Sequence, residues 1–517
     1  MGTLRGLHLE VTSLAAEPPR FRAHGSRDAW SVLARDVVAN GGRLVSLWAS
    51  DRRPLGEGYA VNAAYALAEG LLWVSLPLAA DQQGYPDLAA LFPAASRLQR
   101  MMRDLHGLEA LGAEDARPWL QHGHWPADLH PLRHDTRADA GVADPGGEAY
   151  AFTPVRGEGV HEIAVGPVHA GIIEPGHFRF SVVGEKVLRL EERLGYKHKG
   201  IAARFETLAP LDAHRLAGRV SGDSTVAYSY AYCMALESAW QQSAPPRAEW
   251  LRALALERER VANHLGDLGA LGNDAALGFG LAQFSRLKED WLRINAALTG
   301  HRLLMDYVVP GGVAREPDAS LLTALPAQHA ALRDALAPLA DIYSSHAGLQ
   351  DRFVTTGRVT PALAGALGLT GLAARASGHA VDLRVWHPTP PYAALGVRVA
   401  AERNGDVAAR VAVRFTELTE SLRLLDGLVA GLPDGASRVP LTPLAARAEG
   451  IGWVEGWRGE VLVALELDDA GALRRCHCHD PSWHNWPLLE HAVMGNIVPD
   501  FPLINKSFNL SYAGVDL

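Results

Sequence analysis

Cysteine is scarce in this chain of 517 residues, which contains only Cys233, Cys476 and Cys478. Three thiols cannot form a disulfide framework. They also cannot supply the four thiolates of an iron–sulfur cluster held by one chain. Any site that needs four cysteine ligands from this chain alone is therefore excluded.

Long apolar runs and an excess of positive charge are also missing. The most apolar stretch, residues 65–80, is interrupted by Glu69 and is too short to span a membrane. The formal net charge is −9 and the pI is near 6.2, so no nucleic-acid partner is expected. The N-terminal residues show no signal-peptide core, so we expect a cytoplasmic protein, with attachment to a membrane complex left open.

Periodicity and composition predict an α+β fold in two parts. Residues 1–135 are expected to form a small α/β domain with strands at 43–50 and 71–78. Residues 136–160 carry Gly, Asp and Pro without any period, which is typical of a linker. Residues 161–517 are expected to form a mostly helical domain with small sheets at its edges.

Four long helices are predicted in the second part, because apolar residues recur there every three or four positions. The first three are expected at residues 247–271, 280–304 and 321–345, and the fourth is expected to be capped by Asp406. Residues 459–467 alternate in polarity like a strand.

Residues 166–206 contain the strongest local signals of the chain. Alternating polarity on both sides of Gly184-Glu185 predicts a β-hairpin with a two-residue type II′ turn. The loop before this hairpin carries His169 and Glu174, and a basic turn follows it. Loops held by a rigid hairpin often carry functional residues.

This stretch closely resembles the start of the large subunit of energy-converting [NiFe]-hydrogenases, and more distantly the homologous quinone-site subunit of respiratory complex I. The matching pattern is GPVH…EPGHFRF…E.RLGY.HKGI. Residues 1–135 resemble the C-type accessory subunit of complex I, through a partly matching helix around Asp104 and a closing WP…HPLR run. The resemblance implies an accessory domain followed by a hydrogenase-type large subunit, residues 161–517.

The resemblance also implies where a nickel–iron centre would be held. In the family, two cysteine pairs near the two ends of the large subunit bind the metals, because soft thiolates suit them. In this chain the corresponding residues, called here the four ligand positions, are Ser221, Ser224, Ser511 and Gly514. A serine hydroxyl is not ionised near neutral pH, whereas a metal-bound thiol is deprotonated. We therefore expect a large subunit that binds no metal.

The resemblance to the quinone site is incomplete as well. In the complex I subunit, a loop histidine and a helix tyrosine hold the quinone head group, and the corresponding residues here are Pro175 and Gly222. The acidic partner of that histidine corresponds to Asp274. His169 and His177 flank the loop and are candidate substitutes, although a loop histidine is more often simply solvated.

Because the family brings its two ligand pairs together, the resemblance implies that Ser221–Ser224 face Ser511–Gly514 across one cavity. We expect a polar, water-filled pocket there, because the replacing residues are small and polar. Asp223 lies within the first pair and is expected to pair with Arg258 or Arg384, since a lone buried carboxylate is costly. The candidates for this cavity or for a proton path are Asp223, Glu174, His169, Arg258, Asp274 and Arg384. The alternative is that these residues form structural ion pairs.

The sequence Cys476-His477-Cys478-His479 invites a zinc-site hypothesis. On a strand, successive side chains point to opposite faces, so the cysteines and the histidines are separated. Four ligands arranged in this way cannot close one tetrahedral site. We therefore predict an ordinary strand.

Three functions follow from the resemblance. The first is a metal-free, hydrogenase-like large subunit of a membrane-associated, complex-I-like oxidoreductase, coupling electron transfer from an iron–sulfur small subunit to proton movement. The second is reduction of a quinone or another small oxidant in the cavity. The third is a [NiFe]-hydrogenase, which the cysteine count opposes.

Several partners are implied by the first function. They are the iron–sulfur small subunit and antiporter-like and other membrane subunits, with the chain peripheral on the cytoplasmic side of the inner membrane. The chain itself is expected to bind no cofactor, except a quinone under the second function. No Gly-rich phosphate loop is evident, so any NAD chemistry belongs to another subunit, and catalysis by this chain alone is not expected.

Overall fold

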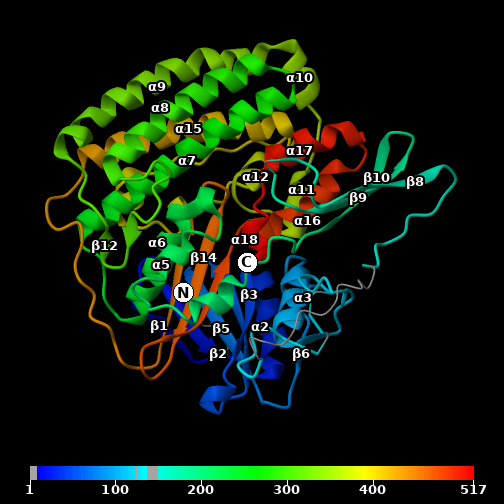
Figure 1. Cartoon of the computed structure of the whole chain (residues 1–517), viewed down its shortest axis with the longest axis vertical. Helices are drawn as coiled ribbons and strands as arrows, with labels where there is room; N and C mark the ends of the chain where they lie inside the picture. The colour runs from blue at the N-terminus through cyan, green and yellow to red at the C-terminus, as the bar shows by residue number, and fades with distance from the viewer. Residues whose placement is uncertain (1–8, 124, 127, 137–149, 172) are drawn as a thin grey trace.

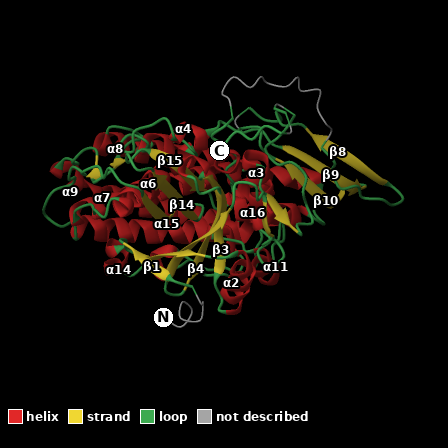
Figure 2. Ribbon diagram, turned by 90° about the horizontal axis from the view of Figure 1, so that it is seen from below, coloured by secondary structure: helices red, strands yellow, loops and turns green. Residues whose placement is uncertain are grey.

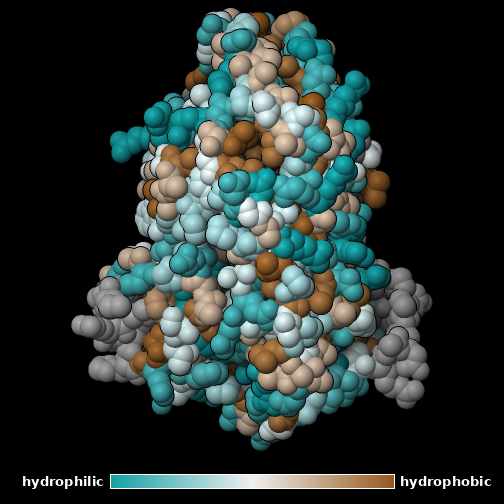
Figure 3. Space-filling model, turned by 90° about the vertical axis from the view of Figure 1, so that its left-hand side faces the viewer, coloured by the Kyte–Doolittle hydropathy of each residue, from teal (hydrophilic) through white to brown (hydrophobic). Residues whose placement is uncertain are grey.

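The computed structural model describes residues 9–123, 125–126, 128–136, 150–171 and 173–517 (Figure 1). Most of the predicted linker, 137–149, lies outside the described residues. Within the described part, no helix combines the length and apolarity needed to cross a bilayer. On the face shown in Figure 3, hydrophilic residues are interspersed with small apolar groups.

The N-terminal part is a five-stranded sheet with the strand order β1-β2-β5-β4-β3. Its elements are β1 (Val11–Leu14), β2 (Arg20–His24), α2 (Arg27–Ala39), β3 (Arg43–Asp51), β4 (Tyr59–Leu67), β5 (Gly70–Leu78) and α3 (Ala95–His106). The strands predicted at 43–50 and 71–78 are confirmed as β3 and β5. Strand β4 was not predicted, because both of its faces are buried and its sequence therefore shows no alternation.

A second sheet lies in the interior of the molecule. It is an antiparallel meander of β13 (Ala448–Glu455), β14 (Glu460–Leu467) and β15 (Leu473–His479). One face packs on the N-terminal sheet and the other on α6 (Thr225–Ala239). The α+β fold class is confirmed, but this sheet is central and not at an edge, since elements far apart in the sequence cover both of its faces.

Two glycines of β13 allow α6 to lie directly on the sheet. A Cβ atom at Gly452 would lie 1.8 Å from the Ala231 carbonyl oxygen, and one at Gly450 would lie 2.0 Å from that of Ala235. Any larger residue at either position would collide with helix backbone, so these glycines are required by the close approach.

The four predicted long helices are confirmed and form the bundle at the top of Figure 1. They are α7 (Pro246–Asp274), α8 (Gly278–Thr299), α9 (Ala319–Ser345) and α15 (Val407–Ala430). The side chain of Asp406 accepts a hydrogen bond from the Ala409 N–H at 2.8 Å and caps α15, as predicted. The bundle has its own apolar core, which includes Leu265, Trp291 and Leu422.

The predicted hairpin is also confirmed. Strands β9 (His177–Val183) and β10 (Lys186–Arg193) pair on either side of Gly184-Glu185, and β8 (Val160–Val165) adds a third strand. Figures 1 and 2 show this sheet projecting from the molecule. The loop that joins β8 to β9 contacts the C-terminal segment through Glu174, which accepts from the Ala513 N–H. That segment contains the helices α16 (Ser482–Val493), α17 (Phe501–Phe508) and α18 (Ala513–Asp516).

Short elements connect these units. They are η1 (Arg53–Leu55), β6 (Gly84–Pro86), β7 (Glu109–Leu111), α4 (Ile201–Phe205), α5 (His214–Ala217), η2 (Gly222–Ser224), β11 (Val308–Val309), β12 (Gly312–Val313), α10 (Ala347–Phe353), α11 (Pro361–Leu367), α12 (Gly371–Ala376), α13 (Leu383–Trp386), α14 (Pro390–Leu395) and η3 (Val498–Asp500).

Candidate functional site

The four ligand positions come from opposite ends of the large-subunit part and meet in space. The hydroxyl oxygens of Ser221 and Ser511 lie 2.9 Å apart, although 290 residues separate them in the sequence. The Gly514 N–H donates to the Ser511 hydroxyl at 2.9 Å. The prediction that the two segments face each other is therefore confirmed.

Asp223 and Arg458 form the charged centre of this site. Two guanidinium nitrogens of Arg458 bind the two carboxylate oxygens of Asp223, one of them at 2.9 Å. The Ser221 hydroxyl donates to the same carboxylate at 2.7 Å. Burial opposes ionisation of Asp223, but Arg458 outweighs it and lowers the carboxyl pKa to about 2.

The expected partners of Asp223, Arg258 and Arg384, were wrong. The guanidinium of Arg258 points to the other side of α7, stacks over the Trp291 ring at 3.9 Å and donates to Asn295. Burial there lowers the pKa of Arg258 to about 9. Arg384 is also buried, but it belongs to a separate group of charges behind the site. Successive residues of an α-helix point about 100° apart, so charged residues that are adjacent in α7 contact different parts of the protein.

A cleft of about 680 Å³ opens beside the Asp223–Arg458 pair. Its lining includes Glu174, Ser221, Asp223, Asn263, Asp267, Asp274, Lys288, Arg458, Lys506, Asn509 and Ser511. These charged and polar side chains alternate with apolar ones, among them Ile173, Leu281 and Leu510, and no phenylalanine belongs to the lining among the described residues. The cleft at the ligand positions is therefore of mixed character, and the water-filled polar pocket stays a prediction.

Of the remaining candidates, Glu174 and Asp274 lie at the cleft and His169 does not. Glu174 accepts a hydrogen bond from the Ala513 N–H at 2.9 Å. Burial raises the pKa of Asp274 from its usual value. The imidazole of His169 is exposed, and its Nδ1 lies 3.1 Å from the Gly166 carbonyl oxygen. Its ring packs edge-on against Phe178, with ring centres 5.6 Å apart, and a role of His169 in a cavity or proton path stays a prediction.

The residues at the four ligand positions do not fit a nickel–iron centre. Three of them offer hydroxyls, and Gly514 offers no side chain at all. A Cβ atom at Gly514 would lie 2.6 Å from a carboxylate oxygen of Asp480. That carboxylate is fixed by hydrogen bonds from the Tyr228 hydroxyl and the Ser482 N–H, both at 2.8 Å. Even a cysteine at position 514 would therefore meet an occupied space.

Sequence reasoning missed Asp480 and Asp516, two carboxylates that position the site. Asp516 accepts hydrogen bonds from the N–H groups of Gly195 and Lys197, both at 2.8 Å, and so fixes the basic turn after β10. Burial raises the pKa of Asp516 to about 7. Only the tertiary fold brings these partners together, and no local pattern indicates them.

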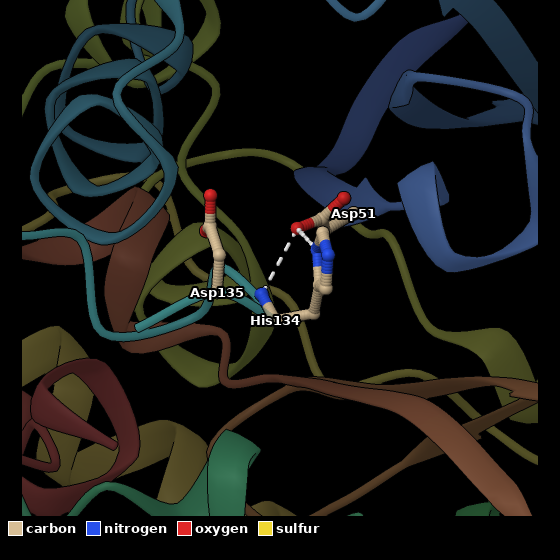
Figure 4. Close-up of side chains that lie close together, drawn as sticks. All are labelled: Asp51, His134 and Asp135. Atoms are coloured by element: carbon tan, nitrogen blue, oxygen red, sulfur yellow. Dashed lines mark hydrogen bonds and ion pairs between the residues drawn. The ribbon is translucent and has the colours of Figure 1, made fainter. Parts of the chain in front are cut away.

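One other group of potential metal ligands lies close together within the described residues. Figure 4 shows Asp51, His134 and Asp135, with His134 directed at Asp51. The guanidinium of Arg53 donates to both carboxylates, at 2.7 and 2.8 Å for its Nη2 atom. A cation therefore already sits between the acids, and we infer no metal site here.

The strand prediction for Cys476–His479 is confirmed by β15. The two cysteines belong to the apolar core beneath α6, whereas the ring of His477 stacks on Trp48 of the N-terminal sheet at 4.8 Å. The four side chains therefore do not converge on one point.

Two family models match the chain. Residues 23–141 match the 30 Kd subunit, and residues 279–448 the 49 Kd subunit, of respiratory-chain NADH dehydrogenase. Formate hydrogenlyase subunit 5 of Escherichia coli is 32% identical over 92% of this chain and 85% of the relative. Hydrogenase-4 component G of the same organism is 31% identical over 92% and 84%.

Two further similarities extend the comparison. The C/D subunit of NADH-quinone oxidoreductase from Phocaeicola vulgatus is 28% identical over 74% of this chain and 77% of the relative. A chain from the membrane-bound sulfane sulfur reductase, an archaeal respiratory membrane complex, superposes with a TM-score of 0.65 at 25% identity. The superposition covers 71% of this chain and 100% of that chain.

Proposed function

Because the chain belongs to the family of hydrogenase large subunits and complex I C/D subunits, we propose that it serves as a large subunit without a nickel–iron centre in a membrane-associated respiratory oxidoreductase. The observation that carries this proposal is the set of residues at the four ligand positions. They converge as a ligand set would, yet they are linked to each other by hydrogen bonds and offer no thiolate.

Electrons reach this subunit from an iron–sulfur partner, and their transfer is coupled to proton movement. The names of the relatives support this arrangement, since they include a membrane-bound hydrogenase and an NADH-quinone oxidoreductase. The membrane partners are antiporter-like and other integral subunits, and the chain lies on the cytoplasmic side of the inner membrane. In this proposal the accessory part and the large-subunit part are divided at residues 136–160.

A second candidate function is reduction of a small oxidant in the cleft. The cleft supports it, because its volume of about 680 Å³ is that of a small-molecule site and it reaches Gly222, the position of the quinone-binding tyrosine. Hydrogen conversion at a nickel–iron centre is the least supported function, because the donor atoms do not suit those metals.

Purification of the native complex tests this proposal. We expect the chain to co-purify from detergent-solubilised membranes with an iron–sulfur protein and with several integral membrane proteins. Mass spectrometry identifies these partners, and absorption and electron paramagnetic resonance spectra detect the cluster. Recovery of the chain alone from the aqueous fraction of the same cells would contradict the proposal.

A further inference from the structure

A group of buried charges lies behind the wall of the cleft and is not explained by the site itself. It connects α7, α12, α13, α15 and β13. Its members, called here the charged cluster, are Glu257, Arg260, His264, Arg375, Asp382, Arg384, Glu417 and Glu455. None of them is more than 5% exposed to solvent.

One half of the charged cluster runs from α7 to β13. His264 Nε2 lies 2.8 Å from a carboxylate oxygen of Glu417. The other oxygen of Glu417 accepts from Arg375 Nε at 2.6 Å. Arg375 Nη1 donates onward to Glu455 at 2.8 Å. Two carboxylates are thus joined through one guanidinium.

The other half closes a ring back to α7. Asp382 Oδ2 lies 3.6 Å from Arg375 Nη1 and 2.6 Å from Arg384 Nη2. Arg384 Nη1 donates to Glu257 at 3.1 Å. Glu257 lies 3.3 Å from Arg260 Nε, one turn further along the same helix. Every charged group of the cluster therefore has an oppositely charged neighbour.

The charges of the cluster do not balance when all of its acids are ionised. Four carboxylates face three guanidiniums, so the ionised cluster with a neutral imidazole carries one net negative charge. An uncompensated charge is costly in a buried region, and one bound proton removes it. The geometry thus calls for one proton on an acid or on the imidazole.

Glu455 is the acid best placed to hold this proton. Its carboxylate accepts one side-chain hydrogen bond, from Arg375, and one from the Leu383 N–H at 3.2 Å. Each of the other three acids accepts at least two side-chain hydrogen bonds, so Glu455 is the least compensated of the four. Burial, and next the negative charge of Asp382, raise the pKa of Glu455 to about 7. Coupled acids of this kind titrate together, with one of them protonated near neutral pH.

His264 is not the preferred holder of the proton, although it faces Glu417. Burial lowers its pKa, and Glu417 opposes that effect, while Arg414 and Arg260 reinforce it. The Nδ1 atom of its ring has no hydrogen-bond partner in the described part of the chain. His264 is thus a neutral imidazole on Glu417, and Arg375 separates that carboxylate from Glu455.

The charged cluster also adjoins the cleft. Asp267 lies one turn after His264 on α7, lines the cleft and pairs with Arg414 at 2.8 Å. The ring of Trp457 packs edge-on against His264, with ring centres 6.2 Å apart, and its Nε1 donates to the Asp223 carbonyl oxygen at 2.9 Å. A change of charge in the cleft therefore acts on the cluster across buried side chains, where electrostatic interactions are weakly screened.

We propose that the charged cluster is a proton-storage site that holds one exchangeable proton on Glu455 and releases or binds it as charge in the cleft changes. The step is a simple proton transfer, in which the carboxylic acid becomes a carboxylate and no electron moves. This proposal rests on the proposed function, because electrons delivered by the partner are the charge to which the site responds.

The pH dependence of stability tests the storage site in the purified full-length chain. An acid whose pKa is raised on folding binds its proton more tightly in the folded state, so stability falls as pH rises from about 5 to about 8. The slope of the unfolding free energy against pH is proportional to the difference in bound protons between the unfolded and folded states. We expect this difference to be smaller by about one proton in Glu455→Gln, because glutamine imitates the protonated acid and does not titrate. Thermal unfolding of the wild type and the variant across this pH range measures the difference.

Two companion variants make the test specific. Asp334→Asn removes an exposed carboxylate of α9 and should keep the wild-type slope. Glu455→Asp retains an acid that can titrate, so it should also retain the wild-type slope. This variant distinguishes loss of the proton site from a purely structural effect of the substitution. An unchanged slope in Glu455→Gln, or the same loss in Glu455→Asp, would overturn the storage site.

The same variant in the native complex separates this proposal from the proposed function. If both hold, Glu455→Gln keeps electron transfer from the partner cluster and lowers the number of protons taken up per electron. If the chain has no electron-transfer partner but the slope difference persists, only the proposed function fails. If the complex transfers electrons and the slope does not change, only the storage site fails.

Discussion

Replacement of Arg375 by methionine is expected to destabilise the folded chain by about 3–5 kcal/mol. Its fully buried guanidinium contacts the carboxylates of Glu417, Glu455 and Asp382. Removing one partner of a buried ion pair leaves an uncompensated buried charge, and that loss far exceeds the net value of the pair. Methionine keeps similar length and apolar contacts, so the loss of charge dominates. The change in free energy of unfolding is measured by urea denaturation.

A surface arginine provides the matched control for this prediction. Arg286 pairs with Asp290 at 3.5 Å on the exposed side of α8, and both side chains are 58% exposed. Arg286→Met should change stability by no more than about 0.5 kcal/mol, because water screens such pairs. If the two substitutions changed the free energy of unfolding equally, the ion pairs of Arg375 would contribute no more to stability than an exposed ion pair.

Gly452→Ala is expected to destabilise the chain by about 3 kcal/mol or more. The added methyl group would lie 1.8 Å from the Ala231 carbonyl oxygen, so α6 must move away from the central sheet. A collision with backbone cannot be relieved by a side-chain rotation, which places this change at the upper end of overpacking effects. Thermal unfolding in one buffer compares the variant with the wild type.

The control for Gly452 is Gly278, at the start of α8. No atom lies within 4 Å of a Cβ atom built there. Gly278→Ala should leave stability unchanged or raise it slightly, since alanine is the better helix former. If Gly452→Ala were as harmless as this control, the close packing of α6 on β13 would be wrong.

Local patterns predicted much of the fold. The hairpin around Gly184 and the helix cap at Asp406 depend on residues within a few positions of each other, and both are present. Strand β4 was not predicted, because a strand that is buried on both faces lacks the alternation of polar and apolar residues by which strands are recognised. The central place of β14 also could not be predicted, because helix α6 and the N-terminal sheet cover it from distant parts of the sequence.

The family resemblance predicted which segments form the site, but it did not predict which side chains form ion pairs there. The meeting of Ser221 with Ser511 followed from the resemblance. The partner of Asp223 did not, since Arg458 lies 235 residues away after a strand whose position only the tertiary fold defines. The resemblance to the arginine-lined cavity of the metal-bearing relatives pointed to Arg258 and Arg384, but helix geometry directs Arg258 into the bundle core.

Nickel analysis of the native complex tests the central claim most directly. The complex is purified from cells that also produce an active [NiFe]-hydrogenase, and both preparations are measured by elemental analysis. Our account predicts one nickel per large subunit in the hydrogenase and no stoichiometric nickel in this complex, because Ser221, Ser224, Ser511 and Gly514 offer no thiolate. One nickel per chain in the complex would contradict it.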